Sequence, residues 1–153
     1  MNINYVPKFI DDAEASTLFQ VLQSNISWNK LNYFKRSVSH YEGNVPQLNE
    51  IILQVQNNFG RSVEGVFLNY YENGNDYAPY HADKYNCDTC LISLGETRIL
   101  RYKHNTTGEN TDYNLANGDL LFIPDEINNN YKHSLLKRTK ITKSRISILL
   151  FFK

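Results

Sequence analysis

A histidine and an aspartate two positions apart, His81 and Asp83, are the first residues whose spacing suggests chemistry. On a strand, residues two apart point to the same side, so the imidazole and the carboxylate would face one site. His133 lies in another predicted strand. Two imidazoles and one carboxylate can hold Fe(II) on one side of the ion and leave positions open for other ligands. The same pair also fits an ordinary strand with polar positions, so it needs support from the rest of the chain.

Three further polar residues could bind an anion beside such a metal. Arg145 begins the last predicted strand, and a guanidinium inside a core needs an anionic partner, to which a carboxylate offers a bidentate fit. Asn69 and Tyr71 share one face of an earlier predicted strand, and both could hydrogen-bond a dicarboxylate. Each has a plain alternative. Arg145 could pair with an acidic side chain, and Asn69 and Tyr71 could be buried polar groups that bond the backbone.

The elements that must position these residues change character along the chain. Helices are predicted at 13–24, after a capping Asp11 or Asp12, and at 46–59, which opens on Pro46 and ends at Gly60. Short strands follow, and they are predicted at 63–71, 77–83, 90–94, 97–102, 112–115, 119–124, 131–136 and 144–153. Many short strands after two helices indicate an α+β, mainly β protein, with a sheet sandwich or barrel supported by helices.

Length and charge limit the classes of function. The chain has 153 residues, which suits one domain, and its 16 Lys and Arg balance 16 Asp and Glu. Bulk charge therefore does not hold nucleic acid, although a basic loop at 137–143 could meet phosphates or simply be solvated. No apolar run reaches the roughly 20 residues of a membrane span, and the N-terminus lacks a signal pattern. We expect an intracellular monomer, in cytoplasm or nucleus, with no membrane partner.

The order and spacing of the motifs resemble those of the AlkB-like 2-oxoglutarate and Fe(II)-dependent dioxygenases. The resemblance covers about residues 36–151, and its main segments are Asn69-Tyr70-Tyr71, His81-Ala82-Asp83, Gly118-Asp119-Leu120, His133-Ser134-Leu135 and Ser144-Arg145-Ile146. It implies one domain over 1–153 with a double-stranded β-helix, or jelly roll, and two N-terminal helices buttressing one sheet.

The resemblance also implies roles for these residues. Fe(II) would be held by His81, Asp83 and His133. The cosubstrate 2-oxoglutarate would be held by Asn69, Tyr71 and Arg145, with Arg145 on its distal carboxylate. With O2, such an enzyme would oxidise an N-alkyl group on a base of single-stranded or flipped-out nucleic acid, as in alkylation repair. Residues 26–44 would form a substrate lid, and the substrate would contact Arg36, Tyr41 and Tyr85.

Two positions depart from the family pattern. Phe151 stands six residues after Arg145, where members usually carry a second arginine, so cosubstrate affinity could be weak. Another cation could replace it, and the candidates are Arg98, Arg101 and Lys103. Tyr85 stands where nucleic-acid repair members usually carry an acid. The alternatives are therefore a 2-oxoglutarate oxygenase acting on protein or a small molecule, and a catalytically idle binding module of the same fold.

Overall fold

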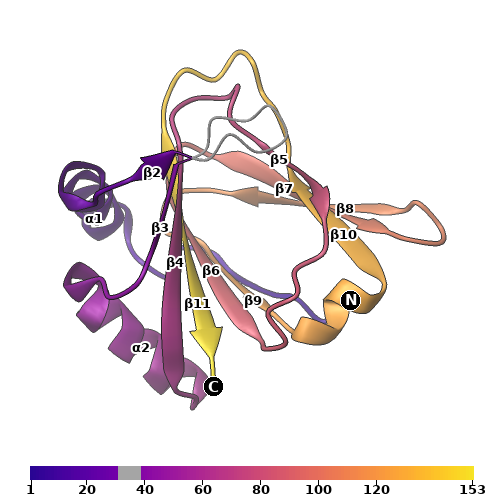
Figure 1. Ribbon diagram of the computed structural model, residues 1–153, viewed down its shortest axis with the longest axis horizontal. Coiled ribbons are helices and arrows are strands. Elements are labelled where there is room, and N and C mark those ends of the chain that lie inside the picture. The colour runs from indigo at the N-terminus through magenta and orange to yellow at the C-terminus, as the bar shows by residue number, and fades with distance from the viewer. Residues whose placement is uncertain (31–38) are drawn as a thin grey trace.

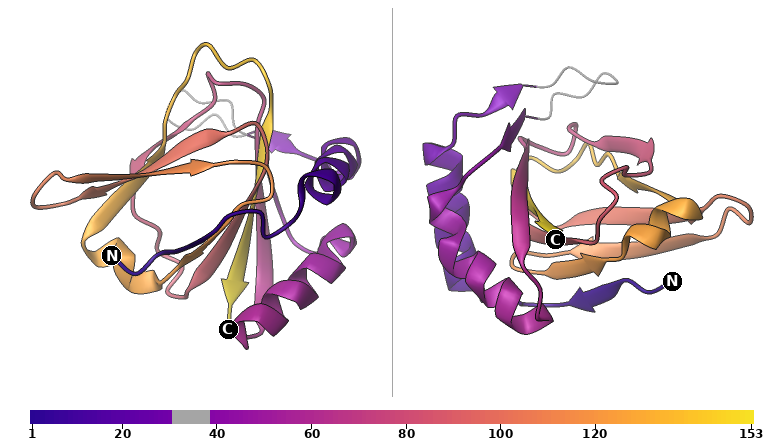
Figure 2. Two further views of the ribbon diagram at one scale, coloured as in Figure 1. Left: turned by 180° about the vertical axis from the view of Figure 1, so that it is seen from behind. Right: turned by 60° about the horizontal axis from the view of Figure 1, so that its bottom comes forward.

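Two antiparallel sheets face each other, and two helices cover the outer face of the larger sheet (Figures 1 and 2). The computed structural model describes residues 1–30 and 39–153. The larger sheet has the strand order β1-β9-β6-β11-β4-β3-β2, and the smaller sheet has the order β5-β10-β7-β8. This arrangement is a jelly roll, so the predicted α+β, mainly β fold is confirmed.

The boundaries of the elements agree closely with the sequence pattern. The larger sheet contains β1 (Asn4–Val6), β2 (Asn29–Lys30), β3 (Ser39–Glu42), β4 (Val63–Tyr71), β6 (Thr89–Gly95), β9 (Leu120–Ile123) and β11 (Arg145–Phe152). The smaller sheet contains β5 (Ala78–His81), β7 (Arg98–His104), β8 (Asn110–Leu115) and β10 (Tyr131–Leu135). The helices are α1 (Asp12–Asn25) and α2 (Asn49–Phe59), with 3-10 turns η1 (Pro46–Leu48) and η2 (Asp125–Asn129).

Both predicted helices form, with their ends fixed by local chemistry. The carboxylate of Asp11 accepts a hydrogen bond from the backbone N–H of Glu14 (2.8 Å) and so caps α1. The second helix differs slightly from its prediction, since residues 46–48 form a 3-10 turn before α2 begins. Gly60 then ends α2 in a left-handed conformation (φ 63°). No helix among the described residues combines the length and apolarity that crossing a membrane requires.

The main core lies between the helices and the outer face of the larger sheet. Its fully buried members come from both layers, and they include Leu22, Leu48, Val55, Leu68, Ile92, Leu94, Ile146 and Ile148. Since successive strand residues point to opposite faces, Asn69 and Ser147 point into the space between the two sheets. The helices therefore stabilise the outer face and leave the inner face for polar residues.

Two loops are locked together at one end of the sheets, at the top of Figure 1. Gly74, in the β4–β5 loop, donates its N–H to the carbonyl of Ile141 and accepts from the N–H of Arg138 (2.8 Å each). Arg98 is 1% exposed and binds both loops, since its guanidinium donates to the carbonyls of Asn73, Asp76 and Leu136. A Cβ atom at Gly74 would lie 1.6 Å from the carbonyl oxygen of Arg138, so the contact requires glycine.

We predict that Gly74→Ala lowers the free energy of unfolding by about 3 kcal/mol or more, because it forces the loops apart and breaks two hydrogen bonds. Urea unfolding measures the change. Gly108→Ala is the matched control, because Gly108 has φ 74° but no atom within 4 Å of an added Cβ. It should cost only about 1 kcal/mol of backbone strain. Equal losses in the two variants would contradict the proposed loop contact.

Candidate active site

The three predicted metal ligands reach one place from a strand end, a loop and a central strand. His81 ends β5 and lies opposite His133 of β10. The predicted strand 77–83 is too long, because β5 ends two residues before Asp83. Asp83 instead lies in a loop that is anchored by a hydrogen bond from its own N–H to the side-chain carbonyl of Asn128 (2.9 Å). Strand β5 therefore positions His81, whereas the hydrogen bond to Asn128 positions Asp83.

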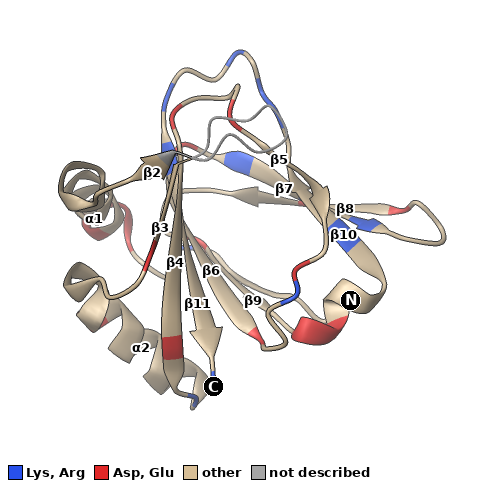
Figure 3. Ribbon diagram, viewed as in Figure 1, with Lys and Arg blue, Asp and Glu red and all other residues tan. Residues whose placement is uncertain are grey.

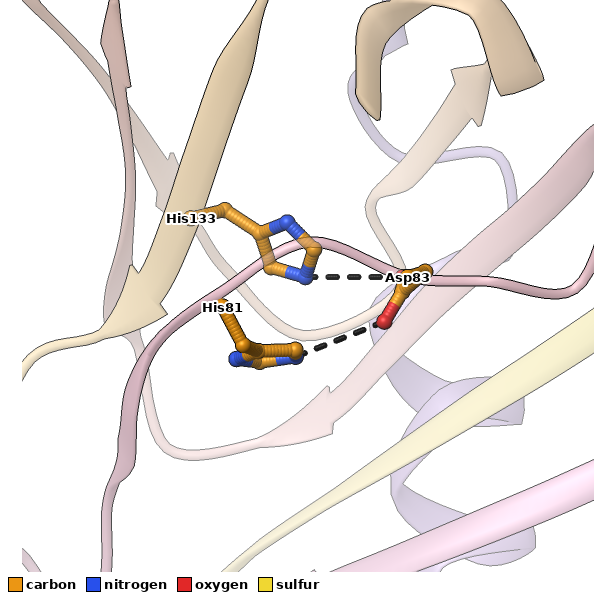
Figure 4. Close-up of side chains that lie close together, drawn as sticks. All are labelled: His81, Asp83 and His133. Carbon is orange, nitrogen blue, oxygen red and sulfur yellow. Dashed lines mark ion pairs between the residues drawn. The ribbon is translucent and has the colours of Figure 1, made fainter. Parts of the chain in front are cut away.

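The side chains of these three residues converge (Figure 4). Nε2 of His81 lies 3.4 Å from one oxygen of Asp83, and Nε2 of His133 lies 3.5 Å from the other. Their ligand atoms all lie within 4.8 Å of one another. Nδ1 of His81 lies 2.7 Å from the carbonyl of Pro79, a contact that orients the ring so that Nε2 faces Asp83. This donor set fits a divalent transition metal with open positions.

The protonation states also suit metal binding. Burial alone would raise the pKa of Asp83, but the hydrogen bond from His81 and the electrostatic interactions with both imidazoles outweigh it and lower the pKa. Burial lowers the pKa of His133 to about 4, against the opposing effect of Asp83. At neutral pH the site thus offers one carboxylate and a neutral imidazole at His133, the forms in which these side chains bind metals.

The cavity that contains these ligands has a volume of about 260 Å³, and one of its walls changes from polar to apolar along its length. One wall is formed by cross-strand pairs of β11 and β4, in the order Arg145–Tyr71, Ser147–Asn69 and Leu149–Phe67. The cation and the hydrogen-bonding groups therefore occupy one end. The predicted cosubstrate residues Asn69, Tyr71 and Arg145 all line the same cavity as the metal ligands.

Arg145 is a buried cation that lacks a carboxylate partner. It is 2% exposed, its Nε donates to the hydroxyl of Ser93 (2.9 Å), and its guanidinium carbon lies 5.3 Å from the ring centroid of Tyr71. No Asp or Glu in the described part of the chain forms an ion pair with it, so the alternative of a structural ion pair is wrong. Burial lowers the pKa of Arg145 to about 10, which leaves it charged at neutral pH. A buried guanidinium without a carboxylate partner is stabilised by binding an anionic ligand.

Two further residues complete the site and were missed from the sequence. Ser93 orients Arg145, and only the strand register could have identified it. Tyr102 is fully buried beside the metal ligands, with its ring centroid 5.0 Å from that of His133. Burial and the charge of Asp83 raise the pKa of Tyr102, so its phenol stays neutral. The sequence pattern placed Tyr102 in a predicted strand, but it could not show that this residue lies opposite His133 on the neighbouring strand.

The predicted substrate-binding residues have different outcomes. Tyr85 lines the cavity, is 43% exposed, and packs edge-on against Phe151 at 4.7 Å. Tyr41 does not line the cavity, because β3 places its ring in the core packing on the helix side, where its hydroxyl donates to the carbonyl of Asn44. Arg36, and with it the central part of the predicted lid at 26–44, lies outside the described residues.

The predicted replacements for a second arginine do not reach the cavity. Arg101 binds Asp112 on the outer face (2.6 Å), and Lys103 lies over the ring of Tyr80. Arg98 lies 5.8 Å from the ring centroid of Tyr71 and contributes nothing to the cavity lining. Among the described residues, Arg145 is thus the only cation that lines the cavity.

We predict that Asp83→Ala abolishes the rise in melting temperature that Mn(II) gives the native chain, because it removes the charge that neutralises the ion. Differential scanning fluorimetry with and without Mn(II) measures the effect. His104→Gln is the control, since this histidine caps a turn by accepting from the N–H groups of Thr106 and Thr107. A metal response that survives in Asp83→Ala would contradict the assignment.

We predict that the metal-free chain loses stability as the pH falls from about 6.5 to about 4. In this window His133 takes up a proton in the unfolded chain but resists it in the folded one, so acid favours unfolding. His133→Gln removes this contribution and should flatten the plot of melting temperature against pH. Parallel curves for the two proteins would show that the pKa of His133 is not lowered in the folded chain.

Comparisons with known proteins agree with this geometry. The chain is 25% identical over 96 residues to an uncharacterized protein of Acanthamoeba polyphaga mimivirus, covering 60% of this chain and about half of that relative. A prolyl-4-hydroxylase of Pseudomonas putida has the same fold, with a TM-score of 0.70, 13% identity, and coverage of 99% of this chain and 91% of that one. The sequence profile of the 2OG-Fe(II) oxygenase superfamily, whose members use Fe(II), 2-oxoglutarate and O2, matches residues 35–149. The chain belongs to this superfamily.

Proposed function

We propose that the chain oxidises an N-alkyl group on a nucleic-acid base, using 2-oxoglutarate as cosubstrate. The observation that carries the catalytic part is the buried Arg145, which forms no ion pair with a carboxylate of the described residues and lines the cavity that contains the His81, Asp83 and His133 cluster. A dicarboxylate bound to this cation would place its other end toward the metal ligands.

The residues of the chain have separable tasks in this reaction. His81 and His133 present nitrogen lone pairs and Asp83 supplies negative charge, which together would hold the metal. When bound, the metal, O2 and 2-oxoglutarate supply the oxidising chemistry, with succinate and CO2 as products of the cosubstrate. Arg145 and Tyr71 would bind the distal carboxylate, and Asn69 would donate a hydrogen bond. Apolar side chains such as Leu149 limit access of water to the reacting groups.

Tyr85 supports a base as the substrate. Its ring lies in the cavity lining near Asp83 and remains 43% exposed, so it offers a flat surface on which a base could stack. Burial and the charges of Asp83 and Glu42 raise its pKa to about 12, so it stays a neutral phenol. Because the metal ligands lie inside the barrel, a base would have to leave its stack to reach them.

A polypeptide is the second candidate substrate, and the charge beside Tyr85 favours it. Glu42 and Asp83 both act on this phenol, while the only cation in the cavity lining of the described chain lies at the far, cosubstrate end. Negative charge near the substrate side disfavours phosphates and tolerates a neutral or basic peptide. The fold of the prolyl-4-hydroxylase is compatible with such a substrate but does not identify one.

We predict release of formaldehyde from an N-methylated single-stranded oligonucleotide, with one succinate per formaldehyde, in the presence of Fe(II), 2-oxoglutarate and O2. Arg145→Gln should raise the 2-oxoglutarate concentration needed for half-maximal rate about 30-fold or more, because a buried charge pair is lost. Arg101→Gln, a surface residue of β7 bound to Asp112, should leave that concentration unchanged.

The products and the binding data distinguish the alternatives. Succinate formation together with a 16 Da gain on a peptide, and no succinate formation with oligonucleotides, would identify a polypeptide as the substrate instead of a base. Binding of 2-oxoglutarate to the Mn(II) protein without succinate from either class of substrate would identify an idle binding module. Failure of the Mn(II) protein to bind 2-oxoglutarate by calorimetry would contradict the cosubstrate assignment itself.

A further inference from the structure

A second cavity, of about 580 Å³, lies beside the β10–β11 loop and contains none of the metal ligands. Its lining comes from Thr97 and the first two residues of β7, from Asn114 of β8, and from residues 137–141 of the loop. In Figure 3 the blue segments of this loop gather at the top of the molecule. The cavity is thus spatially separate from the site described above.

The lining of this cavity is strongly basic. Lys137, Arg138 and Lys140 are exposed, and none of them forms an ion pair with a carboxylate of the described residues. Arg98 adds a fourth positive charge, and no Asp or Glu belongs to the lining. Thr97, Asn114 and Thr139 add hydroxyl and amide groups that can donate hydrogen bonds, and Ile99 and Ile141 are the apolar members of the lining.

Nearby carboxylates only partly offset this charge. Asp112 is close enough for Arg138 to lower its pKa, but it is already bound to Arg101 through two hydrogen bonds. Asp76 and Glu96 act on the buried Arg98. The three exposed cations therefore keep their charge available to a ligand.

The backbone that carries these cations is fixed in place. Besides the two hydrogen bonds between this loop and Gly74, the N–H of Ile141 bonds the carbonyl of Arg138 (2.9 Å), and Arg98 bonds the carbonyl of Leu136 (2.8 Å). The Nε of Arg98 is buried and has no hydrogen-bond partner among the described residues. A held loop binds a ligand at a lower cost in conformational entropy than a flexible basic tail would.

We propose that this cavity binds a ligand bearing several phosphates, either the backbone of single-stranded nucleic acid or a free polyphosphate. A phosphate group offers several acceptor oxygens and can engage more than one cation at once, as the grouping of Lys137, Arg138 and Lys140 allows. The volume exceeds what one phosphate fills, which favours a chain of phosphates. Binding at this cavity does not require catalysis and can be measured without Fe(II).

The test compares two double variants that remove the same charge. Arg138→Gln/Lys140→Gln changes the cavity, whereas Lys132→Gln/Lys153→Gln changes two exposed lysines outside its lining. The probes are a fluorescein-labelled single-stranded oligonucleotide, followed by anisotropy, and tripolyphosphate, followed by calorimetry. If one of these probes represents the natural ligand, we expect the cavity variant to raise the dissociation constant for that probe at least tenfold. The control variant should bind it as tightly as the native chain does. For the oligonucleotide, the slope of log K against log salt should become shallower by about 1.4, for two lost phosphate contacts.

Each outcome has a defined meaning. Loss of oligonucleotide binding in the cavity variant alone supports a nucleic-acid backbone, and loss of tripolyphosphate binding alone supports a free polyphosphate. Equal affinities of the two variants for both probes, or no binding of either probe to the native chain, would overturn the proposal. Formaldehyde release is measured separately, so failure of this site and failure of the proposed function are distinguishable.

Discussion

The register of β11 between β4 and β6 is the constraint on which the active site depends. It sets Arg145 against Tyr71 on one side, and Ser147 against Ser93 on the other. Because strand side chains alternate, a slip of one residue would turn Arg145 into the helix-side core and Ile146 into the cavity. The apolar packing of α1 and α2 on the outer face therefore fixes the register, and the register in turn places the polar groups of the inner face.

The same arrangement leaves the interior with charges that the chain does not neutralise by itself. Arg145 and Arg98 approach Tyr71 to 5.3 Å and 5.8 Å, and the charge of Arg98 helps to lower the pKa of Arg145. Backbone carbonyls accept hydrogen bonds from Arg98, whereas within residues 1–30 and 39–153 the guanidinium of Arg145 contacts only Ser93 and Tyr71. Burying such a charge lowers the free energy of unfolding, and binding of an anionic ligand raises it again. An anion bound at Arg145 would therefore stabilise the fold.

Local pattern accounts for most of what could be predicted from the sequence. Helical spacing with Asp11 and Gly60 at the ends identified both helices, and strand alternation together with motif spacing identified His81, His133 and Arg145. Features that depend on pairing between distant strands were missed or wrong. Ser93 and the inward-facing Tyr102 required the register, and so did the position of Tyr41 on the helix side of β3.

The position of β5 has a consequence for the kinetics of the metal. This strand has four residues, lies at the edge of the smaller sheet, and pairs with β10 through a register that shifts between His133 and Leu135. Short edge strands with irregular pairing open more readily than central ones. A bound ion would join His81 of this weak strand to His133 of the firmer β10. Fraying of β5 should therefore set the dissociation rate of the ion, and amide hydrogen exchange at residues 78–83 should slow markedly when the ion is bound.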